Sequence, residues 1–205
     1  GAGTIKLAGE STGRYTWRHT SGTFNHNDGT VESIIQTDSV IQASSFYNLK
    51  LTHSSSANEI EIADTTGNTI TIANDLTLAE GRLSMLTVGD TLTVTNDVLV
   101  ESGATFNYDD DASGPHNFGS LTINSGGTFN ATSGTTTLNG TVDVGMRVDG
   151  TFNNNDGTFV IDGSITKVQM GSIGGAPTGF SVNNAPFHNL TINDSINFAW
   201  ATGTL

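Results

Sequence analysis

The sequence lacks cysteine entirely and has few basic residues. The absence of cysteine excludes disulfides, zinc–thiolate sites and thiol catalysis. Only 7 Lys and Arg stand against 20 Asp and Glu, which gives a formal net charge of −13. Because nucleic acids and anionic membranes are bound mainly through Lys and Arg, this charge argues against both as partners.

Long apolar runs are also missing. No run approaches the ~18–20 residues of a membrane-spanning helix, so we expect no membrane insertion. Charged residues of both signs make up only 13% of the 205 residues, where ~25% is typical. We therefore expect a surface covered mainly by hydroxyl and amide side chains.

A 23-residue repeat occupies the middle of the chain. The triplet Thr-Phe-Asn occurs at residues 105–107, 128–130 and 151–153, each time after an alternating apolar run. A fixed period of about 20 to 50 residues is the signature of stacked structural repeats. Steps of 23 from Val98 lead to Leu121, Val144, Lys167 and Leu190. The register is therefore predicted to continue toward the C-terminal part of the chain.

The repeat is also recognisable near the start of the chain. Gly22–Val31 reads Gly-Thr-Phe-Asn-His-Asn-Asp-Gly-Thr-Val and closely matches Gly150–Phe159. We therefore expect coils over residues 22–205 and an irregular N-terminal part over residues 1–21. Longer excursions are predicted near residues 108–117 and 174–186, where the repeat is interrupted.

Short runs of alternating apolar and polar residues predict strands. Runs such as Ile60–Ile62, Ile70–Ile72 and Leu92–Val94 have the period of two that half-buried strands show. The sequence thus predicts an all-β fold, a single-stranded right-handed parallel β-helix (β-solenoid) with ~22–23-residue coils, as one domain over residues 1–205. An antiparallel sandwich or a tandem of small β-domains is the alternative, but neither needs a constant register.

The repeated triplet predicts a core column and a corner column. Stacked coils lie ~4.8 Å apart, so residues one period apart lie over one another. We expect an interior aromatic stack of Phe106, Phe129 and Phe152. We expect the following amides to form a corner ladder of hydrogen bonds, made by Asn107, Asn130 and Asn153.

The phrases Gly-Thr-Phe-Asn and Asn-Leu-Thr-Ile resemble the degenerate coils of bacterial surface and secreted β-helix proteins, of the autotransporter-passenger and filamentous-haemagglutinin kind. The resemblance covers most of the chain from about Gly22 onward. It implies an extracellular, cell-surface location and an adhesive or scaffold role. It brings no catalytic residues with it.

Acidic residues are most concentrated in a run of three aspartates, Asp109, Asp110 and Asp111. Hard oxygen ligands of this kind bind Ca²⁺ when they converge, so these three are weak candidate ligands. A solvated loop in an acidic protein is the favoured interpretation, and no cofactor is expected.

Residues for catalysis are few and scattered. The acids expected on strands are Glu59, Glu61, Asp143 and Asp149, and polysaccharide-cleaving β-helix enzymes need convergent carboxylates. The five histidines share no repeat position with a Ser or Asp partner. We therefore expect a protein that is not an enzyme.

Threonines precede the repeated phenylalanines and are expected to face solvent. They form the column Thr23, Thr105, Thr128 and Thr151. Regular threonine arrays on flat solenoid faces can organise water, as in ice-binding proteins. This column is only one residue wide, so the preference of threonine for strands is the better explanation.

The leading functional hypothesis is a non-enzymatic extracellular structural protein, a subunit or segment of a surface fibre, sheath or adhesin. It would assemble head-to-tail through uncapped terminal coils, or continue in a longer chain. The alternative is a module that binds surface glycans through stacking aromatics, with Tyr15, Trp17, Tyr47, Tyr108 and Trp200 as candidates. A polysaccharide-active enzyme comes third.

Overall fold

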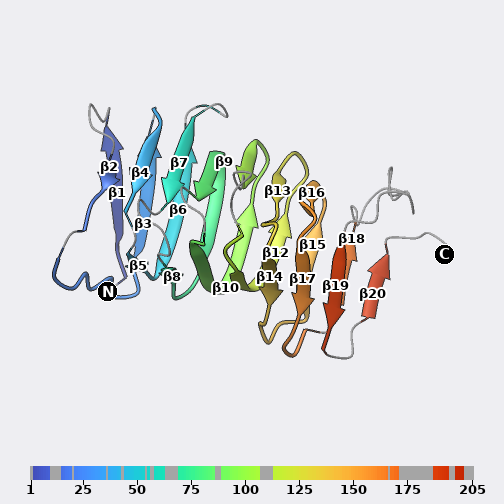
Figure 1. Ribbon diagram of the computed structural model, residues 1–205. Coiled ribbons are helices and arrows are strands. Elements are labelled where there is room, and N and C mark those ends of the chain that lie inside the picture. The colour runs from blue at the N-terminus through green and yellow to red at the C-terminus, as the bar shows by residue number, and fades with distance from the viewer. Residues whose placement is uncertain are drawn as a thin grey trace.

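The computed structural model describes residues 2–9, 15–19, 21–35, 37–42, 44–53, 55, 58–62, 69–85, 89–106, 113–165, 167–170, 187–193 and 197–200. Within these ranges, every element of regular secondary structure is a β-strand (Figure 1). They are β1 (Thr4–Gly9), β2 (Tyr15–Trp17), β3 (Thr30–Ile35), β4 (Ser39–Ile41), β5 (Ser45–Phe46), β6 (Asn48–His53), β7 (Glu59–Ile62), β8 (Thr69–Ile72), β9 (Leu76–Met85), β10 (Thr91–Val100), β11 (Ala104–Phe106), β12 (His116–Ile123), β13 (Thr128–Asn130), β14 (Thr135–Leu138), β15 (Val144–Val148), β16 (Thr151–Asn153), β17 (Thr158–Ile161), β18 (Lys167–Met170), β19 (Asn189–Ile192) and β20 (Asn197–Trp200).

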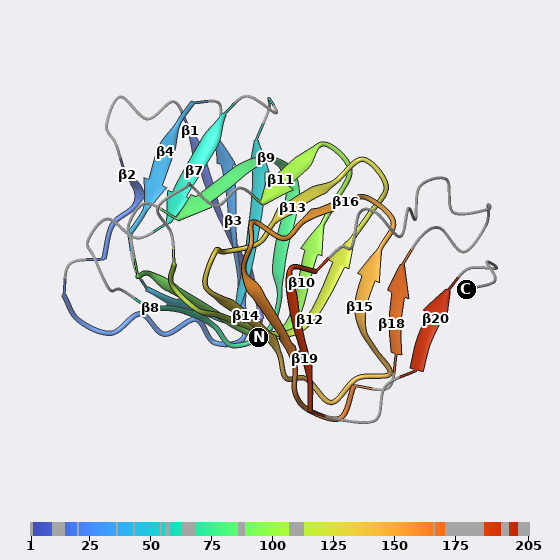
Figure 2. The same ribbon diagram turned by 45° about the vertical axis from the view of Figure 1, so that its right-hand side comes forward.

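The strands wind around three faces of a parallel β-solenoid, and every strand pairs with strands of the coils next to it (Figures 1 and 2). Face A contains β1, β3, β6, the first half of β9, the second halves of β10 and β12, β15, β18 and β20. Face B contains β2, β4, β7, the second half of β9, β11, β13 and β16. Face C contains β5, β8, the first halves of β10 and β12, β14, β17 and β19. The predicted parallel β-solenoid is confirmed, with coils about 23 residues apart.

The register is less constant than the repeat predicts. Val98 lies beside Leu121, as counting by 23 requires, but Leu121 lies beside Met146 rather than Val144. Leu121 and Met146 are therefore 25 residues apart, two more than the repeat. Within β15, Gly145 lies at a β-bulge where the register with β18 shifts by one residue. A Cβ at this position would approach the side chain of Ile165 to 2.5 Å, so the bulge fits glycine.

The prediction that the register continues to Leu190 is wrong. Leu190 lies beside Phe159 on face C, whereas Lys167 lies on face A beside Val144. The paired residues Phe159 and Leu190 are 31 residues apart, so the coil between β17 and β19 is longer than one period. A count of 23 across this insertion moves from one face to another.

The coils also begin earlier than Gly22. β1 pairs with β3 over six positions, from Thr4 beside Thr30 to Gly9 beside Ile35, and β2 pairs with β4. These strands fall in the part of the chain that was expected to be irregular. The runs Thr4–Leu7 and Tyr15–His19 do predict short strands. Because Thr4 and Thr30 are 26 residues apart, the 23-residue period did not show that these strands belong to coils.

The core is built from inward columns that run through successive coils. Phe106, Phe129 and Phe152 occupy aligned positions in β11, β13 and β16. The ring centroids are 4.6 Å apart for the first pair and 5.9 Å for the second, and both pairs are stacked. Leu83 continues the column below Phe106, and Ile60 lies below Leu83. Each fully buried apolar side chain of this size stabilises the fold by about 1.5–3 kcal/mol.

Amide side chains form ladders at two corners. Asn153 donates a hydrogen bond to the Asn130 carbonyl oxygen at 2.7 Å, while Asn107 lies outside the described residues. A second ladder, which the repeat did not predict, joins Asn96 to Asn74 at 2.5 Å and Asn74 to Asn48 at 2.7 Å. Stacked amides of this kind satisfy polar groups along the corner between faces C and A.

Glycines continue this second corner where the asparagines end. They are Gly119, Gly140 and Gly163, each lying over the equivalent residue of the preceding coil. A Cβ on Gly140 would approach the carbonyl oxygen of Gly119 to 2.3 Å. The backbone of adjacent coils is therefore too close for a Cβ at these three glycine positions.

Candidate functional site

Glu32 on face A is paired with two bases rather than with another acid. Glu32 of β3 lies between Lys6 of β1 and Lys50 of β6, with N–O distances of 3.2 Å to each. The hydrogen bond from Lys6, aided by that from Lys50, lowers the pKa of Glu32 against the opposing effect of burial. This cross-strand arrangement stabilises an ionised carboxylate, which is unsuited to general acid catalysis.

Two further acids singled out in the sequence also form ion pairs. Asp143 accepts a bond from Lys167 at 2.6 Å, and Asp149 accepts one from Arg147 at 2.8 Å. Within the described ranges, no group of three or more His, Asp or Glu side chains could hold a metal ion. Asp109, Asp110 and Asp111 lie outside these ranges, so calcium binding there stays a prediction.

Glu59 and Glu61 both lie on β7, at the two half-buried positions that alternate with buried isoleucines. The backbone N–H of Glu59 donates to the carboxylate of Asp38 at 3.0 Å. Glu59 lies beside Arg82 in the next coil, and Glu61 lies beside Ser84. The structure therefore gives neither glutamate an opposing carboxylate in the adjacent position of β9.

The histidines are dispersed over the solenoid, and two of them are core residues. His116 and His53 are buried, whereas His188 is exposed and lies 3.2 Å from the carboxylate of Asp156. The Nδ1 atom of His116 accepts a hydrogen bond from the Leu92 N–H at 3.2 Å. Burial lowers the pKa of His116 to about 4, opposed by a hydrogen bond to the backbone of Pro115. His116 is therefore neutral at pH 7.

The sequence analysis did not predict that His116 is a core residue, although the alternating pattern around it indicates this. His116 and Phe118 alternate with outward residues, as Leu92 and Val94 do in the preceding coil. His116 therefore occupies an apolar position of the period-two pattern. Its ring stacks on Phe118, with centroids 5.8 Å apart.

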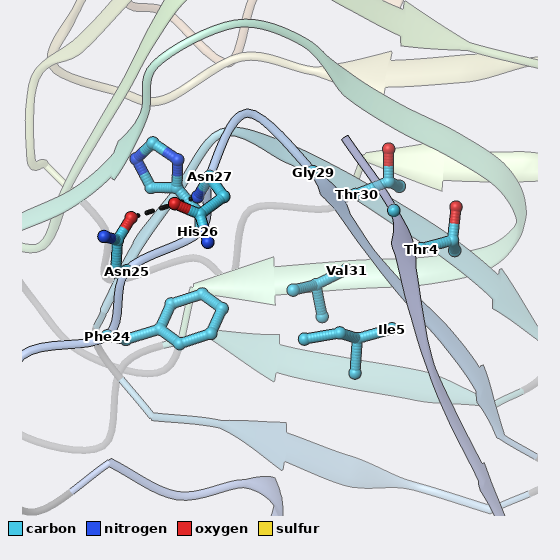
Figure 3. A pocket seen from close by; sticks show the side chains of 10 residues that line it. Thr4, Ile5, Phe24, Asn25, His26, Asn27, Gly29, Thr30 and Val31 are labelled. Carbon is cyan, nitrogen blue, oxygen red and sulfur yellow. Dashed lines mark hydrogen bonds between the residues drawn. The ribbon is translucent and has the colours of Figure 1, made fainter. Parts of the chain in front are cut away.

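A cavity of about 210 Å³ lies beside the turn that leads into β3 (Figure 3). The side chains of Phe24, Asn25 and His26 line it from the turn, and Thr4 and Ile5 line it from β1. The walls are thus amide, imidazole, hydroxyl and hydrocarbon, with no carboxylate among the lining residues. Such a lining can donate and accept hydrogen bonds.

The proposed aromatic platforms are only partly described. Trp17 is half-buried and packs edge-on against Phe24 and Phe46, with centroids 4.8 and 5.6 Å apart. It is therefore a core side chain rather than an exposed platform. Tyr47 is half-buried, with its ring 5.6 Å from that of His26. The remaining candidates, Tyr108 and the side chains of Tyr15 and Trp200, lie outside the described part.

The terminal coils expose side chains at positions that are buried elsewhere. Ile5 is 47% exposed, although the residue beside it, Val31, is 2% exposed. At the other end, Leu190 and Ile192 are 38% and 39% exposed. They follow the buried Phe159 and Ile161 in their columns. The apolar interior is thus open to solvent at both ends of the described solenoid.

Comparisons with protein-family models, with curated proteins and with solved structures found no match to this chain. The β-solenoid architecture therefore stands on the geometry alone. No helix of the described chain has the length and apolar character to cross a membrane.

Proposed function

We propose that this chain is a non-enzymatic structural segment of an extracellular fibre, sheath or adhesin, and that its solenoid associates end to end with a second copy. The observation that carries this proposal is the exposure of inward-pointing residues in the terminal coils, Ile5 at one end and Ile192 at the other. Fully burying one such side chain is worth about 1.5–3 kcal/mol. A further coil over each end, from a second copy or from a continuation of the same chain, would recover this energy.

Unpaired strand edges support the same proposal. Among the described residues, β1 pairs with β3 on one side, and β20 pairs with β18. Their other edges present rows of backbone N–H and C=O groups, which readily pair with another strand. Both strands belong to face A, so stacking β1 of one copy on β20 of the next would continue that face.

The geometry of such a contact favours a filament. The two ends are different surfaces, and a contact between different surfaces repeats indefinitely unless rotation closes it into a ring. The solenoid axis would continue from copy to copy. The extracellular location rests on the resemblance to bacterial surface β-helix proteins.

Light scattering and electron microscopy of the purified chain test the proposal. We expect concentration-dependent oligomers that appear as rods whose width is that of one solenoid. Ile192→Lys places a charge in the end surface and should prevent association. Thr122→Lys is the matched control, because Thr122 faces outward from the middle of face A beside Leu99 and Arg147. A wild-type chain that stays monomeric at high concentration would refute the proposal.

Glycan binding is a second candidate, favoured by the cavity beside β3. Its amide side chains and the neighbouring rings of His26 and Tyr47 are groups that recognise sugar hydroxyls and faces. A glycan array, with His26→Ala as the comparison, tests this function. Absence of binding to any glycan would remove it.

A further inference from the structure

Face C carries two straight outward columns composed mainly of threonine. The first column contains Thr69, Thr91, Thr135, Thr158 and Asn189, together with Pro115, which directly precedes His116 at the start of β12. The second contains Thr71, Thr93, Asn117, Thr137, Val160 and Thr191. Eight of these twelve positions are threonine, and the residues between the two columns point into the core.

These columns differ in composition from the outward positions of the other two faces. None of the twelve residues is charged or aromatic, although the protein has a net charge of −13. Face A carries the ion pairs of Glu32 and Arg147, and face B carries Glu59 beside Arg82. Strand preference for threonine acts equally on all three faces, so it does not explain this difference.

The two columns form a regular grid of hydroxyl and methyl groups. Neighbouring coils place equivalent residues ~4.8 Å apart, and residues i and i+2 of one strand lie roughly 6.6 Å apart. β-Branched side chains are restricted at χ1, so the grid is held rigidly. These two repeat distances are close to those between oxygen atoms on the surface of hexagonal ice.

We propose that face C binds ice, through a layer of water ordered by the two threonine columns. Methyl groups favour a cage-like arrangement of water around them, and the hydroxyl groups anchor that arrangement to the protein. Charged side chains would hold hydration shells of a different geometry, and face C has none among the twelve positions.

The composition of the face favours ice over other flat ligands. Crystalline polysaccharides are recognised by exposed aromatic rings, and the columns contain none. Protein partners are usually anchored by Trp, Tyr or Arg, which are also missing from these twelve positions. Of the predicted outward column, Thr105, Thr128 and Thr151 form a single row on face B, next to Arg82. Thr23 lies in no strand and is not part of this row.

The experiment measures thermal hysteresis and crystal shape of single ice crystals in solutions of the protein. Wild type should lower the growth temperature below the melting temperature and produce faceted crystals. Thr93→Lys should abolish both effects, because it places a long charged chain between Thr71 and Asn117 in the second column.

Thr128→Lys is the matched control. Thr128 is also a half-buried outward threonine, and it lies between Thr105 and Thr151 on face B. It should retain full hysteresis, and circular dichroism should show that both variants keep the wild-type fold. Absence of hysteresis and faceting in wild type, or equal loss in both variants, would overturn the proposal. So would binding to microcrystalline cellulose or chitin without any effect on ice.

Discussion

Phe129 stacks on Phe106 of the preceding coil, with ring centroids 4.6 Å apart and planes inclined by 25°. Both side chains are fully buried. In the other direction Phe129 stacks on Phe152, whose ring is only half-buried. The column thus has a buried middle and a more exposed end.

Phe129→Ala should be among the most destabilising single substitutions. Truncating a buried phenylalanine removes its transfer energy and leaves a cavity, which together cost about 3–5 kcal/mol. Phe152→Ala should cost less, because that ring is already partly solvated. Urea unfolding followed by circular dichroism measures both changes, with the outward Thr128→Ala as control. Equal losses for Phe129 and Phe152 would contradict this account.

The stability of the protein should fall as the pH drops from about 6.5 toward 4. Burial lowers the folded-state pKa of His116 to about 4, from an ordinary value of 6.5. As the pH falls, His116 therefore becomes protonated at a higher pH in the unfolded chain than in the folded protein. Acidification thus favours unfolding. The stability is complete above pH 6.5 and decreases by about 3 kcal/mol by the time the folded-state pKa is reached.

His116→Leu identifies the source of this loss. Leucine occupies the aligned position 92 in the preceding coil, so the substitution suits the core. The free energy of unfolding of the variant, measured between pH 7 and 4, should show a smaller slope than wild type. The Glu32 ion pairs weaken only as the pH falls toward 4.5, the ordinary pKa of glutamate, and they contribute equally to wild type and variant, so they cancel in the comparison. An unchanged slope would assign the acid sensitivity to other groups.

The sequence predicted the solenoid and its aromatic column because both depend on a residue's position within one coil. A side chain in a parallel stack meets the same neighbours in each coil, so Phe106 and Phe129 recur at the period of the fold. The turns show the same effect. Asn27 and Asn155, which belong to matching segments, both adopt a φ of 45°.

The positions of insertions, and the face on which each strand lies, could not be predicted from the repeat. The period-two pattern is alike on all three faces, so Leu190 was assigned to face A although it lies on face C. The threonine columns were hidden by unequal coil lengths. Thr93 and Asn117 are 24 residues apart, whereas Asn117 and Thr137 are 20 apart. The surroundings of His116 could not be predicted either, because Leu92 and Phe106, which contact it, come from other strands.

Gly140→Ala should destabilise the solenoid although it adds only one methyl group. The new Cβ would lie 2.3 Å from the carbonyl oxygen of Gly119 and 2.8 Å from its carbonyl carbon. Backbone atoms cannot rotate away as a side chain can, so adjacent coils would have to separate, at a cost of about 1–3 kcal/mol. Thermal unfolding measures the change, and the exposed neighbour Asn139→Ala is the control. Identical melting temperatures for the two variants would show that the corner tolerates a side chain.

Asn74 is the middle member of the ladder between Asn48 and Asn96, and its substitutions separate hydrogen bonding from packing. Its side-chain N–H₂ donates to Asn48 at 2.7 Å and to Asp75 at 2.9 Å, and its oxygen accepts from Asn96 at 2.5 Å. Asn74→Ala should cost about 1–3 kcal/mol, because it removes these bonds and leaves partners unsatisfied.

Asn74→Asp should cost more than Asn74→Ala, although aspartate has nearly the shape of asparagine. An ionised aspartate has no donor, and it would place a negative charge against the Asn48 oxygen and the Asp75 carboxylate. Lowering the pH to 4, close to the ordinary pKa of aspartate at about 3.9, partly protonates the new carboxyl group and should narrow the difference between the two variants. Urea unfolding at pH 7 and pH 4 measures both effects. If alanine proves the more destabilising at pH 7, the ladder acts through shape rather than through its hydrogen bonds.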